Sequence, residues 1–166
     1  MAELTQKERL QPSLLDRLVD DDPTSRVESR EQRVFAMTKL RELVLRDLAW
    51  LLNCESLENL EDLEPFPHVK KSVVNFGVPA LSGTTLSGTN LQLLEKRVRA
   101  AVNVFEPRIL SDSVSVRAYK SDSEMSKKSL SIEIEGELWA QPIPLRLFLR
   151  TEVDLDTGTV IVKEQK

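Results

Sequence analysis

The stretch LSIEIEGEL, residues 130–138, decides the fold, because apolar and polar side chains alternate along it. The same alternation occurs in VSVRAY at residues 114–119 and in LRLFLRTEV at residues 145–153. A period of two is typical of strands that lay one face on a core. The turn sequence DTG at residues 156–158 predicts a hairpin, after which TVIV at residues 159–162 returns as the last strand. We therefore expect a small, mainly antiparallel β-sheet in the C-terminal part of the chain.

Two segments before the sheet carry apolar side chains at helical spacing. The first spans about residues 30–53 and the second about residues 89–104, and Pro107 is expected to stop the second helix. Helices that precede a sheet in the chain indicate an α+β fold, with the N-terminal helices packed on one face of the sheet. Residues 30–166 are thus predicted to form a single α+β domain.

Residues 1–29 are expected to form an N-terminal arm. Leu14, Leu15 and Leu18 share one face of a short amphipathic helix, and Pro23 comes after a run of three aspartates that should end it. So short a helix has too little sequence around it to bury these leucines. We expect them to dock on the domain or on a partner protein.

Composition excludes several classes of function. The chain has 27 acidic and 23 basic side chains, a net charge of −4, which does not suit a nucleic-acid phosphate backbone. We find no signal peptide and no apolar run near the roughly 20 residues of a membrane helix, so we expect a cytoplasmic protein without direct membrane insertion. The single cysteine, Cys54, cannot form an internal disulfide, and its leucine neighbours predict a buried thiol.

Catalytic, metal and cofactor motifs are missing from the sequence. His68 is the only histidine and lies in a proline-flanked segment, and no Cys/His cluster or phosphate-binding glycine loop is present. Glu133, Glu135 and Glu137 could be read as hydrolase carboxylates, but their spacing is that of the polar face of a half-buried strand. We expect no enzyme activity and no cofactor, and a hydrolase remains the alternative.

Two features suggest protein binding instead. Glu106, Pro107 and Arg108 fall where the second helix should end, and an arginine there can fork onto a carboxylate. The segment is either an internal clasp that ties helix to sheet or a recognition element for a partner. Val160, Ile161 and Val162 form a last strand that could be an open edge, which another chain can extend, or an ordinary protected edge.

The sequence resembles the TssE-type baseplate subunit of type VI secretion systems and the wedge protein of contractile-tail phage baseplates, historically called lysozyme-like. The resemblance covers nearly the whole chain and depends on the order of six short motifs. These motifs are Pro12–Leu18, Arg46–Asn53, Ser72–Pro79, Phe105–Arg108, Ile134–Trp139 and Val153–Gly158. The chain departs from the family pattern at Cys54, where threonine is usual, and at Ala80, where aspartate is common.

The resemblance implies a structural, phage tail-like role. Glu106, Pro107 and Arg108 would contact the core bundle of the wedge, built by TssF- and TssG-like subunits, and the C-terminal sheet would accept strands from sheath subunits during contractile sheath assembly. The arm would tether the subunit, a TssK-like connector would join the assembly, and the protein would be recruited to the cytoplasmic face of the inner membrane. A peptidoglycan-cleaving hydrolase and a free anti-adaptor-like regulatory protein remain alternatives.

Overall fold

The structure is a computed structural model that describes residues 14–18, 37–80, 90–120, 129–139, 145–155 and 157–164. Its α-helices are α2 (Leu14–Leu18), α3 (Met37–Leu52), α4 (Pro67–Lys70) and α5 (Leu91–Phe105). Short 3-10 helices occur as η1 (Leu57–Asn59), η2 (Val73–Asn75) and η3 (Ser111–Ser113). The strands are β1 (Ser115–Lys120), β2 (Ser129–Leu138), β3 (Leu145–Asp154) and β4 (Val160–Glu164). Helices therefore precede strands, as the sequence predicts.

The four strands form one antiparallel sheet in the order β1-β2-β3-β4. Register places Ile134 between Val116 on β1 and Leu149 on β3, and it places Thr151 beside Val162 on β4. The inward-facing side chains alternate with polar ones on the opposite face, and this alternation confirms the predicted period of two. The first and last strands, β1 and β4, are the edges of the sheet.

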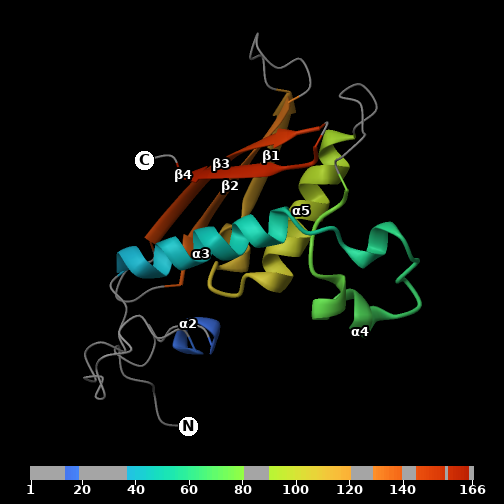
Figure 1. Cartoon of the computed structure of the whole chain (residues 1–166), viewed down its shortest axis with the longest axis horizontal. Helices are drawn as coiled ribbons and strands as arrows, with labels where there is room; N and C mark the ends of the chain where they lie inside the picture. Colours follow the sequence, from blue (N-terminus) through green and yellow to red (C-terminus); the bar gives the residue numbers. More distant parts are fainter. Residues whose placement is uncertain are drawn as a thin grey trace.

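The long helices α3 and α5 cover one face of this sheet (Figure 1). Helix α5 lies against β1 and α3 lies against β4, and the two helices also contact each other. Val44 and Leu48 on α3 and Val98 and Val102 on α5 are fully buried against the sheet. Burial of each such side chain contributes about 1.5–3 kcal/mol, so this layer is the main source of stability.

The ends of α5 follow from local sequence. Asn90 caps the start of the helix, since its side-chain oxygen accepts a hydrogen bond from the Leu93 backbone N–H at 3.1 Å. Pro107 follows the C-cap residue Glu106 and prevents continuation, because proline has no N–H for the helical ladder. The predicted helix of residues 89–104 is thus confirmed to within two residues. Of the first predicted helix, residues 30–36 lie outside the described part of the chain.

The connection from α3 to α5 is folded back against the end of α3. Glu55 and Val78 form a parallel bridge, in which Val78 N–H donates to the Cys54 carbonyl at 2.9 Å. Gly77 has a φ of 137°, and a Cβ there would lie 2.5 Å from the Cys54 oxygen, so only glycine fits. The buried amide of Asn75 accepts from Glu58 N–H and donates to the Lys70 carbonyl, each at 2.9 Å. These contacts hold the segment of residues 56–79 together and against the end of α3, and an edge-to-face contact between Phe76 and Phe105 places it beside α5.

The prediction of a buried Cys54 thiol is wrong. Cys54 is exposed, whereas Leu51 and Leu52 before it are buried. Helix α3 ends at Leu52, so the helical spacing that would place residue 54 near the core no longer applies. The arm boundary at residue 29 stays a prediction, because residues 19–36 lie outside the description. Within the described residues, no helix combines the length and the hydropathy needed to cross a membrane.

Candidate functional site

The Glu106-Pro107-Arg108 segment forms a charged clasp at the end of α5. Glu106 is only 2% exposed. Its carboxylate accepts two hydrogen bonds from the Arg108 guanidinium, from Nε at 2.7 Å and from Nη2 at 2.5 Å. The Arg108 backbone N–H donates to the same carboxylate at 3.2 Å. Such a bidentate pair fixes orientation as well as supplying energy. Pro107 stands exposed between the two charged residues.

The clasp extends across two further helices. Nη2 of Arg108 also donates to Asp47 Oδ2 at 2.5 Å, and Asp47 in turn binds Arg46 at 2.7 Å. Arg46 then reaches Asp16 of α2 at 2.7 Å. Alternating charges therefore connect the end of α5 with α3 and with the arm helix. We call this set of Asp16, Arg46, Asp47, Glu106 and Arg108 the charged clasp.

The electrostatics of the clasp keep it ionised. Burial by itself would lower the pKa of Arg108, but the hydrogen bonds and charges of Glu106 and Asp47 outweigh burial and raise the pKa above its ordinary value. The pKa of Arg46 is raised in the same way: burial lowers it, and Asp16 and Asp47 more than compensate. Neither guanidinium can therefore act as an acid or base near neutral pH, and their chemistry is that of fixed charges.

The internal role of the clasp differs in part from expectation. The sequence left two interpretations open, an internal clasp or a partner-binding element. The internal clasp was expected to connect the helix to the sheet through Glu106 or Arg108. The side chains instead tie α5 to α3, through Asp47. The sheet is held by backbone groups of the same segment, since Trp139 N–H donates to the Arg108 carbonyl at 2.7 Å and Leu110 N–H donates to the Glu137 carbonyl at 2.9 Å. Partner binding by Glu106, Pro107 and Arg108 stays a prediction.

The predicted last strand, β4, lies at an edge of the sheet, and one of its residues is already capped. Asn53, just past α3, accepts a hydrogen bond from Val160 N–H and donates one to the Val160 carbonyl, both at 2.9 Å. The Asn53 side-chain amide thus makes the two hydrogen bonds that the backbone of a neighbouring strand would make to Val160. Backbone groups alternate in direction along an antiparallel strand, so Val162 faces outward as Val160 does. Within the described part of the chain, no side chain bonds the Val162 backbone.

The opposite edge, β1, is covered. Helix α5 lies against this strand, and Glu95 of α5 accepts a hydrogen bond from the outward Ala118 N–H at 2.8 Å. An edge strand presents unpaired groups that another chain can use, and a carboxylate placed on them blocks that use. Each edge strand thus has one outward residue that a side chain of the domain occupies, Ala118 on β1 and Val160 on β4.

The arm leucines are partly described. On α2, Leu15 is 46% exposed and Leu18 is 74% exposed, while nothing is described of the Leu14 side chain. Asp16 between them points to Arg46 and anchors the helix through the charged clasp. Helix α2 thus contacts α3 through Asp16, and partner binding by its leucines stays a prediction.

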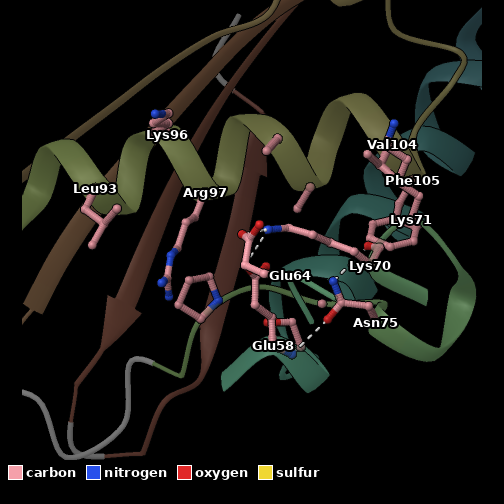
Figure 2. Close-up of a pocket in the computed structure, with 15 residues that line it drawn as sticks. Glu58, Glu64, Lys70, Lys71, Asn75, Leu93, Lys96, Arg97, Val104 and Phe105 are labelled. Atoms are coloured by element: carbon pink, nitrogen blue, oxygen red, sulfur yellow. Dashed lines mark hydrogen bonds and ion pairs between the residues drawn. The ribbon is translucent and has the colours of Figure 1, made fainter. Parts of the chain in front are cut away.

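Sequence reasoning missed one further feature, a groove of about 470 Å³ between α5 and the segment of residues 56–79 (Figure 2). The residues of α5 that line it include Leu93, Arg97, Ala100 and Val104, which share one face of the helix. The spacing of these residues, three or four apart, could have indicated a second exposed face on α5. The more strongly apolar stripe of the same helix was instead assigned to the core, and the second face was not predicted. The described residues contain no cluster of three or more His, Cys, Asp or Glu side chains that could hold a metal ion.

Comparisons with known proteins gave a family match and a similar solved structure. A family model described as baseplate wedge protein gp25 matches residues 38–143. A crystal structure of a candidate tail lysozyme from Geobacter sulfurreducens is 22% identical, covers 70% of this chain and 92% of its own, and superimposes with a TM-score of 0.44. The search of curated proteins gave no significant match.

Proposed function

Because the chain belongs to the baseplate wedge protein gp25 family, and is thus a structural component of a contractile tail-like apparatus, we propose that it is the TssE-type subunit of a type VI secretion system. In this role it binds wedge subunits and starts the sheath. Its contacts would be with TssF- and TssG-like wedge subunits, a TssK-like connector and the first sheath ring, on the cytoplasmic face of the inner membrane. The observation that carries the proposal is the open edge of β4.

Strand addition at β4 is supported by the hydrogen-bonding groups that remain there. Val162 has outward backbone groups and a half-buried side chain, while Ile161 is 53% exposed on the outer face. An added strand gains affinity from backbone hydrogen bonds and specificity from alternate side chains. Since Asn53 already occupies Val160, an incoming sheath strand would begin to pair at Val162 unless it displaced this amide.

Wedge binding would use the outer surface of the charged clasp. Glu106 is buried, so its role in docking is to hold Arg108 rather than to touch the partner. Pro107 is exposed, and the Arg108 side chain is 24% exposed. A rigid corner of this kind presents a fixed shape to a helical bundle at low entropic cost. Leu15 and Leu18 of the arm would add apolar contacts beside it.

Three carboxylates in the groove and on the sheet form bonds within the domain. Glu58 and Glu64 in the groove both bind Lys70, at 2.9 and 2.8 Å. On the sheet, Glu133 accepts a hydrogen bond from the Tyr119 hydroxyl at 2.7 Å. A glycosidase needs two carboxyl groups that flank its substrate, whereas these side chains are tied to neighbouring residues of the domain. We therefore propose a non-catalytic protein.

The edge is tested by proline at matched positions of the two edge strands. Val162→Pro on β4 removes an outward N–H, and Val116→Pro on β1 does the same at the covered edge, with a side chain of similar burial. We expect sheath fluorescence in cells to disappear with Val162→Pro and to persist with Val116→Pro, while both proteins still bind the wedge. Normal sheaths with a folded Val162→Pro variant would refute strand addition at β4.

Wedge docking is tested separately at the clasp. Replacing Glu106 and Arg108 together by Gln and Met removes the fixed corner without leaving an unpaired charge at residue 106. We expect co-purification of wedge subunits to be lost, with the thermal unfolding of the variant still cooperative. Unchanged co-purification from a folded variant would remove the clasp from the docking surface.

A further inference from the structure

The groove between α5 and residues 56–79 is a second candidate docking surface, away from the sheet edge. Figure 2 shows α5 along one side of it and the segment that carries Glu58, Glu64, Lys70 and Asn75 along the other. The bonds of Asn75 to the backbone of Glu58 and Lys70 hold that second wall in place. The groove is therefore a formed feature of the fold, and its volume of about 470 Å³ is large enough for several side chains.

Helix α5 has a second apolar stripe that faces this groove. Its core stripe, which includes Leu94, Val98 and Val102, is buried under the sheet. Leu93 and Val104 lie on another face with Ala100 between them, and they remain 47% and 41% exposed. Eleven residues separate Leu93 from Val104, which is about 16 Å, or three turns of helix. A soluble helix usually has one apolar stripe, so the second one indicates a contact that the described chain does not supply.

The charge around the groove is opposite to that of the whole protein. The Lys70 ammonium group forms ion pairs with Glu58 and Glu64. Lys71, Lys96 and Arg97 also line the groove, and none of them forms an ion pair with a described residue. Four cations against two carboxylates leave a local charge of +2 in a chain of net charge −4. In Figure 2 the Arg97 side chain extends from α5 into the groove.

We propose that this groove binds an acidic amphipathic helix of a partner protein, about three turns long. Its apolar side chains contact the stripe from Leu93 to Val104, and its carboxylates meet Arg97, Lys71 and Lys96. The expected length of the partner helix follows from the length of the exposed stripe on α5. Its expected acidic character follows from the unpaired cations that line the groove. This contact is separate from strand addition at β4 and from the charged clasp, and it holds whether or not those proposals do.

The test is a photo-crosslink from the groove in the native cell. The full chain carries p-benzoylphenylalanine in place of Leu93, and the crosslinked peptide is identified by mass spectrometry. The matched pair of variants is Arg97→Glu, in the groove, and Arg99→Glu, an exposed arginine of the same helix that does not line it. Both arginines lack ion pairs with described residues, so neither charge reversal should disturb folding, which circular dichroism checks.

We expect a crosslink to one net-negative helical segment, with a yield at least about tenfold lower for Arg97→Glu and unchanged for Arg99→Glu. A synthetic peptide of that segment should bind the purified protein, and reversal of one of its acids to lysine should restore binding to Arg97→Glu. The proposal is overturned by a crosslink to a neutral or basic segment, by a crosslink to nucleic acid or lipid, by no crosslink, or by equal yields from the two variants.

Discussion

Replacement of Arg108 by Met should destabilise the protein strongly, because it leaves the Glu106 carboxylate buried without its cation. Glu106 is 2% exposed and would keep only the backbone hydrogen bond of residue 108. Breaking a buried ion pair from one side costs about 3–5 kcal/mol, whereas the lost link to the quarter-exposed Asp47 adds at most about 1 kcal/mol. The total is a large share of the stability of a typical domain, about 5–15 kcal/mol.

Urea unfolding followed by circular dichroism measures this loss. With a slope of about 2 kcal/mol per molar urea, the midpoint should fall by roughly 1.5–3 M at unchanged slope. The double variant Glu106→Gln with Arg108→Met removes both charges, so it should recover at least about 2 kcal/mol of the loss. Asp47→Asn should cost less than about 1 kcal/mol, and Arg99→Met less than about 0.5 kcal/mol.

The reasoning depends on the burial of the Glu106 carboxylate. If Arg108→Met shifts the midpoint no more than Arg99→Met does, the pair contributes little and the clasp is a surface feature. If the double variant is as unstable as Arg108→Met, the loss comes from packing of the arginine stem, and an unpaired buried charge is the wrong explanation.

Three further predictions concern single residues. Gly77→Ala should lower the midpoint of thermal unfolding by more than about 4 °C, because the new Cβ meets the Cys54 carbonyl; a smaller change would show that the turn adapts. Burial and the hydrogen bond to Glu133 raise the pKa of Tyr119, so its contribution to stability is present below the unfolded pKa of about 10 and is lost as pH rises through the folded value. Since Tyr119 is the only tyrosine, absorbance at 295 nm should titrate above pH 10, and a midpoint at or below 10 would contradict this. The exposed thiol of Cys54 should react with Ellman's reagent in native protein within about threefold of its rate in urea, and strong protection would restore the buried interpretation.

The sheet and both long helices could be predicted from side-chain periodicity. Alternation of the kind seen from Leu130 to Leu138 indicates strands when it recurs in several segments, so an antiparallel sheet could be expected from the sequence. The burial of Cys54 was inferred from the leucines before it, but α3 ends at Leu52, so the burial of its last residues does not carry over to residue 54. A shift of one or two residues there turns a side chain from the core to solvent.

The candidate site was predictable in part. The Glu106-Pro107-Arg108 motif was recognised from charge and proline alone, but its partner Asp47 is 61 residues away along the chain, and no local pattern connects them. The same holds for Asn53, whose amide meets Val160 at a separation of 107 residues. The groove needs two segments whose approach depends on the turn at Gly77. Contacts between segments so far apart depend on tertiary packing, and local spacing does not predict them; for the groove, only the exposed stripe on α5 could have been found in the sequence.

The unequal margins of the sheet have a consequence for assembly. Glu95 of α5 occupies the outward Ala118 N–H on β1, and Asn53 occupies Val160 on β4, so under the proposed strand addition a new strand would pair along β4 from Val162 onward. A polymer seeded on this strand would grow with a defined polarity.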